Sequence, residues 1–320
     1  MKWLISCLLL LFVTLSASAQ SHTEESQVDT GSGVLYGSLQ RPDTAAPGPV
    51  VLIIAGSGPT DRDGNSPLLS GHNDGLKQIA EALASQGIAS LRYDKRGIAQ
   101  SRAALPSMAT LRLDDLANDA AAWLRQLRKD RRFNAVFVAG HSEGSLLGML
   151  AAQQVPVEGF ISLAGPAQRA SDLLRLQIKP QLSAEDFKQA DAALSVLEAG
   201  GTPELWPASM VSLFHPSLHS YVVSWIQRVP AQELARLDVP CLIIQGTLDD
   251  RVPRGEARAL QAARPGAELL IVPGMTHTLK LAEANRDSII RSYHDASMQP
   301  PPAMLDALVK FIRSHPKPGA

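Results

Sequence analysis

Residues 140–144 have the sequence GHSEG, whose residue types and spacing are those of a reactive serine site. They match the pattern G-x-S-x-G, in which a serine stands on a sharp turn between a strand and a helix. Because such a turn leaves little space two residues to either side of Ser142, it requires the small residues Gly140 and Gly144. The helix that follows presents N–H groups to negative charge developing on a carbonyl oxygen. The pattern predicts that Ser142 is a nucleophile; the alternative is a glycine-rich turn with an idle serine.

A serine hydroxyl is a weak nucleophile and needs an imidazole base. Of the eight histidines, His277 lies just past the last predicted strand, in the segment VPGMTH. His294 is the rival, but it lies in an irregular stretch away from any predicted strand end. We therefore predict that His277 is the base.

The imidazole in turn needs a carboxylate, expected between the serine and the histidine in the chain. The segment LIIQGTLDDRVP contains two candidates, Asp249 and Asp250. Asp249 comes three residues after Gly246, where the strand is predicted to end, and we predict that it is the acid. Asp250 is left to pair with Arg251 or to cap the next helix.

Two backbone N–H groups are expected to bind the developing oxyanion. One belongs to Glu143, the residue after the nucleophile, and the other to Ser57, in the loop IAGSGP after an earlier buried strand. The sequence DRDGN at 61–65 invites a calcium interpretation, but Ser66 and His72 occupy the positions where an EF-hand needs glycine and glutamate. We predict a hydrogen-bonded loop there and no metal site.

Strands and helices that alternate along the chain must position these groups. Buried or alternating apolar runs predict strands at 34–39, 49–55, 88–93, 133–139, 159–164, 240–245 and 268–272. Helical spacing predicts helices at 76–85, 111–129, 145–153 and 305–314. This alternation indicates an α/β protein with a mostly parallel sheet and helices on both faces.

Residues 166–236 break the alternation, and we predict that they form a helical cap inserted into the fold. Four of the aromatic residues in the cap stand out in a chain that is only 5% aromatic. Some of them are expected to pack within the cap, and all are candidates for the wall of a substrate pocket: Trp206, Phe214, Tyr221 and Trp225.

The first nineteen residues are predicted to be a signal peptide. Lys2 precedes an apolar run from Trp3 to Val13, and Ala17-Ser18-Ala19 has the small-x-small pattern of a cleavage site. The run is shorter than the roughly 20 residues that span a membrane. We therefore expect an exported protein, periplasmic or secreted, that starts at Gln20 and keeps no membrane anchor.

Composition narrows the possible partners. Apolar residues make up 45% of the chain, which excludes a disordered protein. Lys and Arg number 30 against 31 Asp and Glu, so no basic excess exists to bind nucleic acid. Two cysteines, Cys7 and Cys241, are too few for a disulfide framework or a thiolate zinc site.

Taken in order, the segments GSGPTDRDGN, LRYDKRG, GHSEGS, LFHPS, GTLDDRVP and GMTHTLK resemble the α/β-hydrolases, and among them the bacterial exported EstD-type carboxylesterases. They cover roughly residues 30–315. The resemblance implies an α/β-hydrolase core at 20–165 and 237–320. It gives the triad roles to Ser142, Asp249 and His277 and the oxyanion roles to Ser57 and Glu143. Residues 94–97 (DKRG) match a structural loop and receive no catalytic role.

The expected activity is hydrolysis of a small-molecule ester, of small to medium acyl size, through an acyl-enzyme on Ser142. No metal or organic cofactor is needed for it. Related families also include serine aminopeptidases, so peptide substrates stay an alternative, although the cap offers no clear acidic site for a substrate amine. A non-catalytic binding protein on the same fold is a further alternative. An idle site, however, has no physical need for all five catalytic groups.

Overall fold

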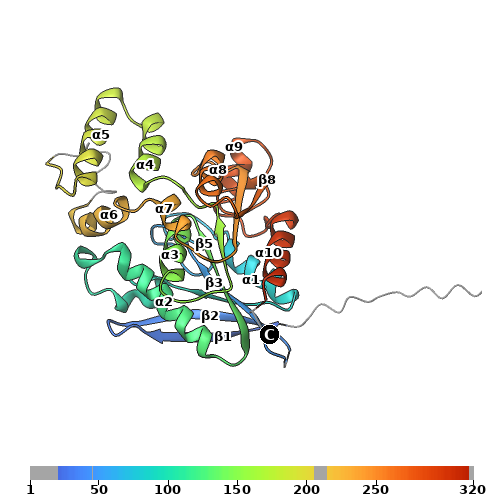
Figure 1. The fold of residues 1–320 in the computed structure, drawn as a ribbon. Coiled ribbons are helices and arrows are strands. Elements are labelled where there is room, and N and C mark those ends of the chain that lie inside the picture. The colour runs from blue at the N-terminus through green and yellow to red at the C-terminus, as the bar shows by residue number, and fades with distance from the viewer. Residues whose placement is uncertain (1–20, 45, 205–214, 317–320) are drawn as a thin grey trace, which may run out of the picture.

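An eight-stranded sheet forms the centre of the protein, which is seen here as a computed structural model describing residues 21–44, 46–204 and 215–316 (Figure 1). The strand order is β1-β2-β4-β3-β5-β6-β7-β8. β1 and β2 run antiparallel to their neighbours, and the other strands, β3 to β8, are mutually parallel. The strands are β1 Ser21–Asp29, β2 Val34–Pro42, β3 Gly48–Ile54, β4 Ala89–Tyr93, β5 Phe133–His141, β6 Gly159–Leu163, β7 Cys241–Leu248 and β8 Glu268–Thr276.

Helices connect the parallel strands, as parallel pairing requires. Ten α-helices lie in the described ranges: α1 Gly75–Ser85, α2 Leu113–Lys129, α3 Glu143–Ala152, α4 Ala170–Ile178, α5 Ala184–Glu198, α6 His219–Ile226, α7 Pro230–Ala235, α8 Arg254–Ala263, α9 Arg286–Arg291 and α10 Pro302–Ser314. The predicted α/β-hydrolase fold is confirmed.

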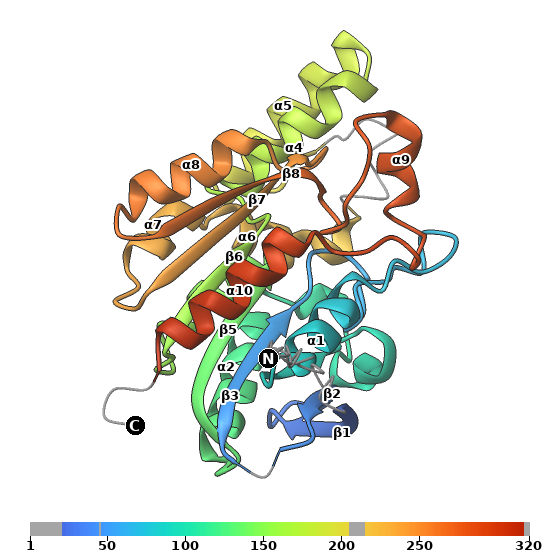
Figure 2. The same ribbon diagram turned by 90° about the vertical axis from the view of Figure 1, so that its right-hand side faces the viewer.

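The helices cover both faces of the sheet because alternate residues of each strand point to opposite sides. In β3, Val50, Leu52 and Ile54 face a core formed with α2, α3, α7 and α8. Val51 and Ile53 face a second core formed with α1 and α10. In Figure 2, α10 crosses the near side of the sheet. Since both faces are covered, the central strands are apolar along nearly their whole length.

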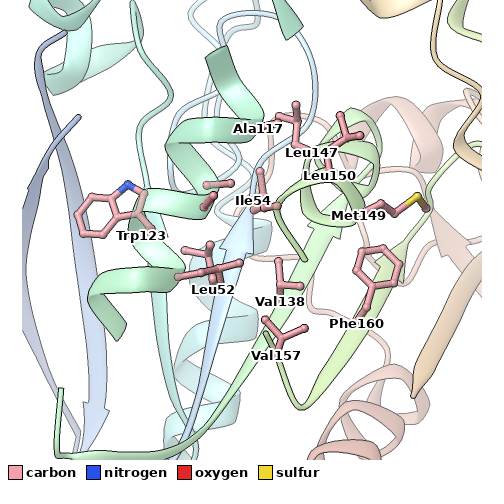
Figure 3. Close-up of a cluster of buried hydrophobic side chains, with 14 of the residues drawn as sticks. Leu52, Ile54, Ala117, Trp123, Val138, Leu147, Met149, Leu150, Val157 and Phe160 are labelled. Carbon is pink, nitrogen blue, oxygen red and sulfur yellow. The ribbon is translucent and has the colours of Figure 1, made fainter. Parts of the chain in front are cut away.

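The core beneath α2 and α3 supports the turn between β5 and α3, which carries Ser142. Figure 3 shows Leu52, Ile54, Val138 and Phe160 of three neighbouring strands facing side chains of these two helices. Gly148 of α3 lies against this layer, since a Cβ there would come within 3.2 Å of the Phe160 ring. The close packing fixes α3, and with it the turn from which the helix starts.

The predicted cap, residues 166–236, contains helices and no strand among its described residues. α4, α5 and α6 gather at one end of the molecule, away from β1 and β2 (Figure 1). They share a small apolar core of their own, whose members include Ala170, Leu194 and Ile226. α7, by contrast, packs through Leu234 into the main core. The cap thus has its own apolar cluster, and its last helix, α7, packs into the main core against the sheet.

One strand, β1, is missing from the sequence prediction. Its sequence, SHTEESQVD, is polar and has no apolar alternation. Among the described residues, β1 is an edge strand that pairs only with β2, and ion pairs such as Arg41–Glu24 (2.7 Å) and Arg132–Glu24 (2.8 Å) stabilise it. Charged edge strands are common because they resist pairing with other chains. Such strands are stabilised by pairing with the neighbouring strand, so no local apolar pattern in the sequence predicts them.

The predicted signal peptide lies outside the described residues, as do Trp206 and Phe214. Among the residues that are described, none of the helices has the length and apolar character needed to span a membrane.

Candidate active site

The turn between β5 and α3 carries Ser142 in a strained conformation. Its φ of 55° and ψ of −121° lie outside the regions that non-glycine residues normally adopt. A Cβ at Gly140 would overlap the carbonyl of Gly144, and one at Gly144 would overlap the carbonyl of Ile54. The two glycines are therefore required by packing, as the sequence predicts. The Ser142 N–H donates to the Leu163 carbonyl of β6 at 2.9 Å, which fixes the turn against the sheet.

His277 and Asp249 meet at the carboxyl edge of the sheet, where the parallel neighbours β7 and β8 end. Both strands run further than the sequence predicts, to Leu248 and Thr276, so each residue directly follows its strand. His277 Nδ1 lies 2.9 Å from Asp249 Oδ2. Since an ionised carboxylate only accepts hydrogen bonds, Nδ1 donates and Nε2 is left free to take a proton.

The Asp249 carboxylate is fully buried and accepts three further hydrogen bonds. Oδ1 accepts from the N–H groups of Arg251 and Val252, both at 2.8 Å, and Oδ2 accepts from Gln245 Nε2 at 2.8 Å. Burial by itself raises the pKa of Asp249, but His277 and the two N–H donors outweigh it, so this pKa lies below its usual value. Asp249 is therefore held as an anion facing His277.

The two rival residues lie elsewhere. Asp250 is partly exposed and accepts a hydrogen bond from the Tyr293 hydroxyl, with Arg251 Nε 3.7 Å away. His294 follows α9 and donates its backbone N–H to Arg291. The carboxylate that contacts an imidazole in this region is that of Asp249, and its partner is His277.

His141, to which the sequence analysis gives no role, joins the nucleophile turn to the His277 loop. Its Nε2 donates to the His277 carbonyl at 2.7 Å, and the two imidazole rings lie 4.8 Å apart between centroids. Burial, with the nearby His277, lowers the pKa of His141 to about 3. A neutral ring with its proton on Nε2 is thus fixed beside Ser142. The only sequence signal for it was its place inside the G-x-S-x-G pattern.

The loop after β3 lies directly against the nucleophile turn. A Cβ at Gly56 would lie 3.3 Å from Ser142 Cβ and 3.3 Å from His141 Nδ1. Ser57 follows and is a solvent-exposed residue. Among the residues that the structure describes, no group accepts a hydrogen bond from the N–H of Ser57 or of Glu143. Two free N–H donors on segments that flank Ser142 are what an oxyanion site needs.

Of the four aromatic residues predicted for a pocket wall, Tyr221 and Trp225 are described. Both are partly buried on α6, between the cap cluster and the main core, with ring centroids 5.7 Å apart. The Tyr221 hydroxyl donates to Glu143 Oε1 at 2.6 Å. The cap therefore contacts Glu143, the residue that follows Ser142.

The segment at 61–65 forms the hydrogen-bonded loop that the sequence predicts. Asp61 Oδ1 accepts from the N–H groups of Asp63 and Asn65, both at 2.9 Å. Asn65 Oδ1 in turn accepts from the N–H of Asn73 at 2.8 Å, just before α1. Across residues 21–44, 46–204 and 215–316, His, Cys, Asp and Glu side chains form no group of three or more that could hold a metal ion.

These features define an α/β-hydrolase fold with a serine on a strained turn and a hydrogen-bonded Asp–His pair at the carboxyl edge of the same sheet. The family described as serine aminopeptidase, S33, matches residues 69–192, a range that includes Ser142.

Esterase EstD of Thermotoga maritima is 28% identical to the chain over 248 residues, which is 77% of this chain and 58% of that protein. The chain thus spans less than two thirds of EstD. Rhodomycin D methylesterase DauP of a Streptomyces species is 26% identical, over 64% of this chain and 80% of that protein. Among solved structures, Est1E of Butyrivibrio proteoclasticus with bound ferulic acid superposes with a TM-score of 0.57 at 18% identity, covering 91% of this chain and 98% of that one. The chain has the α/β-hydrolase fold, and its predicted resemblance to EstD-type esterases is confirmed by these similarities.

Proposed function

We propose that this protein is a serine carboxylic ester hydrolase that acts on small to medium acyl esters. The observation that carries the proposal is the 2.9 Å hydrogen bond from His277 Nδ1 to the buried Asp249, at the sheet edge where Ser142 stands on its strained turn. The fold and the relatives named esterase and methylesterase support chemistry on ester bonds.

In the proposed mechanism, Ser142 Oγ attacks the ester carbonyl while His277 Nε2 takes the hydroxyl proton. Asp249 holds the imidazole in the required tautomer and stabilises the imidazolium that forms. The N–H groups of Ser57 and Glu143 donate to the carbonyl oxygen as it becomes an oxyanion. The carbon–oxygen ester bond then breaks, and His277 gives its proton to the departing alcohol. Water repeats the attack on the acyl-enzyme and restores the Ser142 hydroxyl.

A peptidase with the same catalytic residues is a second candidate, because the matching family is described as serine aminopeptidase. Both activities use the same acyl transfer, and they differ in the leaving group and in the site for the substrate amine. Parallel assays with aryl esters and aminoacyl anilides separate them. Ester turnover with no anilide turnover supports the esterase function. Faster turnover of the anilides would instead show that the protein is a peptidase.

The nucleophile is tested with a fluorophosphonate probe and the Ser142→Ala variant. The wild-type protein is expected to be labelled once per chain at Ser142, and Ser142→Ala is expected to lose the label and roughly 10³-fold or more in kcat. Circular dichroism checks that the variant is folded. A Ser142→Ala preparation, free of contaminants, that retains ester hydrolysis would refute the mechanism.

We also propose that the protein is exported, to the periplasm or the medium, with residues 1–19 removed. The support is the order of a basic residue, an apolar run and a small-x-small site at the N-terminus.

A further inference from the structure

Lys95 is a buried lysine at the carboxyl edge of the sheet, two residues after the end of β4. Only 4% of its side chain is exposed. Its ammonium group donates a hydrogen bond to the Gly56 carbonyl, in the loop that follows the neighbouring strand β3. The same Nζ lies 3.7 Å from Glu143 Oε2. One positive charge therefore contacts both segments that flank Ser142.

The contact with Gly56 bears on the oxyanion site because the Gly56 carbonyl and the Ser57 N–H belong to the same planar peptide group. A donor bound to the oxygen fixes the direction of the N–H on the other side of the plane. It also draws electrons toward the oxygen, which makes the N–H a stronger donor. Gly56 is buried against the turn that carries Ser142, whereas Ser57 is exposed.

The second contact involves the side chain of Glu143, whose backbone N–H is the other oxyanion donor. Its carboxylate is fully buried. Oε1 accepts from the Tyr221 hydroxyl, and burial beside this carboxylate raises the pKa of the Tyr221 phenol. Oε2 has no hydrogen-bond partner among the described residues, and Lys95 is the cation beside it.

A structural role alone accounts poorly for this lysine. Burying an ammonium group is costly, and one carbonyl plus a carboxylate 3.7 Å away compensate it only in part. Buried ion pairs can often be replaced by apolar residues without loss of stability. The long apolar stem could be supplied by methionine, so the charge itself needs a reason.

We propose that Lys95 is a positioning residue of the active site, which orients and polarises the Gly56–Ser57 peptide toward the oxyanion. The inference rests on the proposed esterase function. Because the charge on the carbonyl oxygen develops only in the transition state, Lys95 is expected to act on kcat and to leave KM nearly unchanged.

The test compares the wild type with Lys95→Met, with the double variant Lys95→Met/Glu143→Gln, and with the control Arg96→Met. Arg96 lies on the same loop but pairs with Asp119, through Nη2 to Oδ1 at 2.6 Å. Loss of one oxyanion donor costs roughly 10²–10³-fold in kcat, so loss of its orientation is expected to cost about 10–10²-fold. KM should change by less than about threefold, and the affinity for a trifluoromethyl ketone, which forms an oxyanion adduct, should fall in parallel with kcat/KM.

The double variant separates orientation from uncompensated charge. Lys95→Met leaves the Glu143 carboxylate without its cation, and the added Glu143→Gln removes that charge. If Lys95 acts through the Gly56 peptide, the double variant stays as slow as Lys95→Met, even if it is more stable. Recovery of wild-type kcat in the double variant overturns the proposal, as does an equal loss of kcat in Arg96→Met, which would indicate a general effect of the loop.

A measurement without turnover separates this proposal from the esterase function. The amide ¹⁵N resonance of Ser57 responds to hydrogen bonding at the Gly56 carbonyl, and it should shift in Lys95→Met but not in Arg96→Met. An unchanged Ser57 resonance overturns the positioning role even if the enzyme is an esterase. A shifted resonance in a protein whose wild type hydrolyses no ester overturns the esterase function and leaves the contact standing.

Discussion

Replacing Asp249 by asparagine changes a carboxylate that accepts four hydrogen bonds into an amide with one acceptor oxygen. The four donors are His277 Nδ1, Gln245 Nε2 and the N–H groups of Arg251 and Val252. If the amide oxygen keeps the two backbone donors, its NH₂ group faces His277 and Gln245. His277 can then pair only by accepting at Nδ1, which moves its proton to Nε2.

Two effects of different size follow for Asp249→Asn. An imidazole protonated at Nε2 cannot take the Ser142 proton, and kcat is expected to fall by roughly 10²- to 10⁴-fold. Gln245 Nε2 keeps its bond to the Val252 carbonyl, at 3.0 Å, so the unfavourable contact between two amide NH₂ groups destabilises the fold by only about 1–3 kcal/mol. Activity should therefore be lost while the protein stays folded.

The matched control is Asp250→Asn, one residue along the chain. Asp250 is 39% exposed in its side chain and pairs with Tyr293 and Arg251, so the change should alter stability by less than about 0.5 kcal/mol. Steady-state kinetics on an aryl ester, with urea unfolding of both variants, measure the two effects. The reverse ranking moves the acid to Asp250, and wild-type turnover in both variants refutes the role of a carboxylate beside His277.

Four further outcomes are expected. The pKa of His141 is about 3 in the folded protein against 6.5 ordinarily, so between these pH values the unfolded chain binds more protons and stability falls as pH falls. Urea unfolding at pH 7 to 5 should show this slope reduced in His141→Gln, by at most about 1.4 kcal/mol per pH unit; equal slopes contradict a buried neutral ring. Gly144→Ala should lose activity and soluble yield together, because its Cβ overlaps Ile54, and a fully active Gly144→Ala would exclude that overlap. Trp225→Ala should shift relative kcat/KM between short and medium esters by roughly tenfold, whereas an unchanged profile removes Trp225 from the pocket wall. N-terminal sequencing of protein from the periplasm or medium should begin at Gln20, and a chain that retains Met1 contradicts cleavage.

The sequence was sufficient where sterics or apolar periodicity leave few choices. Gly140 and Gly144 predict the turn that carries Ser142, because the backbone leaves no room there for a side chain. The central strands of the parallel sheet, such as β3, are recognisable because they are buried on both faces. β1 was missed because its stability comes from pairing with β2 and from ion pairs to residues distant in the chain.

Contacts between segments were the part that sequence could not supply. Asp249 and Asp250 are adjacent and identical in type; the position of Asp249 after Gly246 favoured it in the sequence, and in the folded chain its hydrogen bonds with His277 and with two backbone N–H groups distinguish it. Lys95 falls in a motif that indicated a structural loop, and nothing local points to its hydrogen bond with Gly56. That contact exists because β3 and β4 are parallel neighbours in the sheet, so the loops that follow them lie side by side.

The same sheet edge explains why residues so far apart in the chain converge. In a parallel sheet every strand ends at the same edge, so the loops after β3, β4, β5, β7 and β8 are brought together by the pairing alone. They carry, in that order, Gly56, Lys95, Ser142, Asp249 and His277. The sheet thus determines which residues can meet, and local features determine how they meet: the φ of 55° at Ser142, the four donors on Asp249 and the buried ammonium of Lys95. A substitution in the sheet should therefore change stability first, whereas one in these loops should change turnover first.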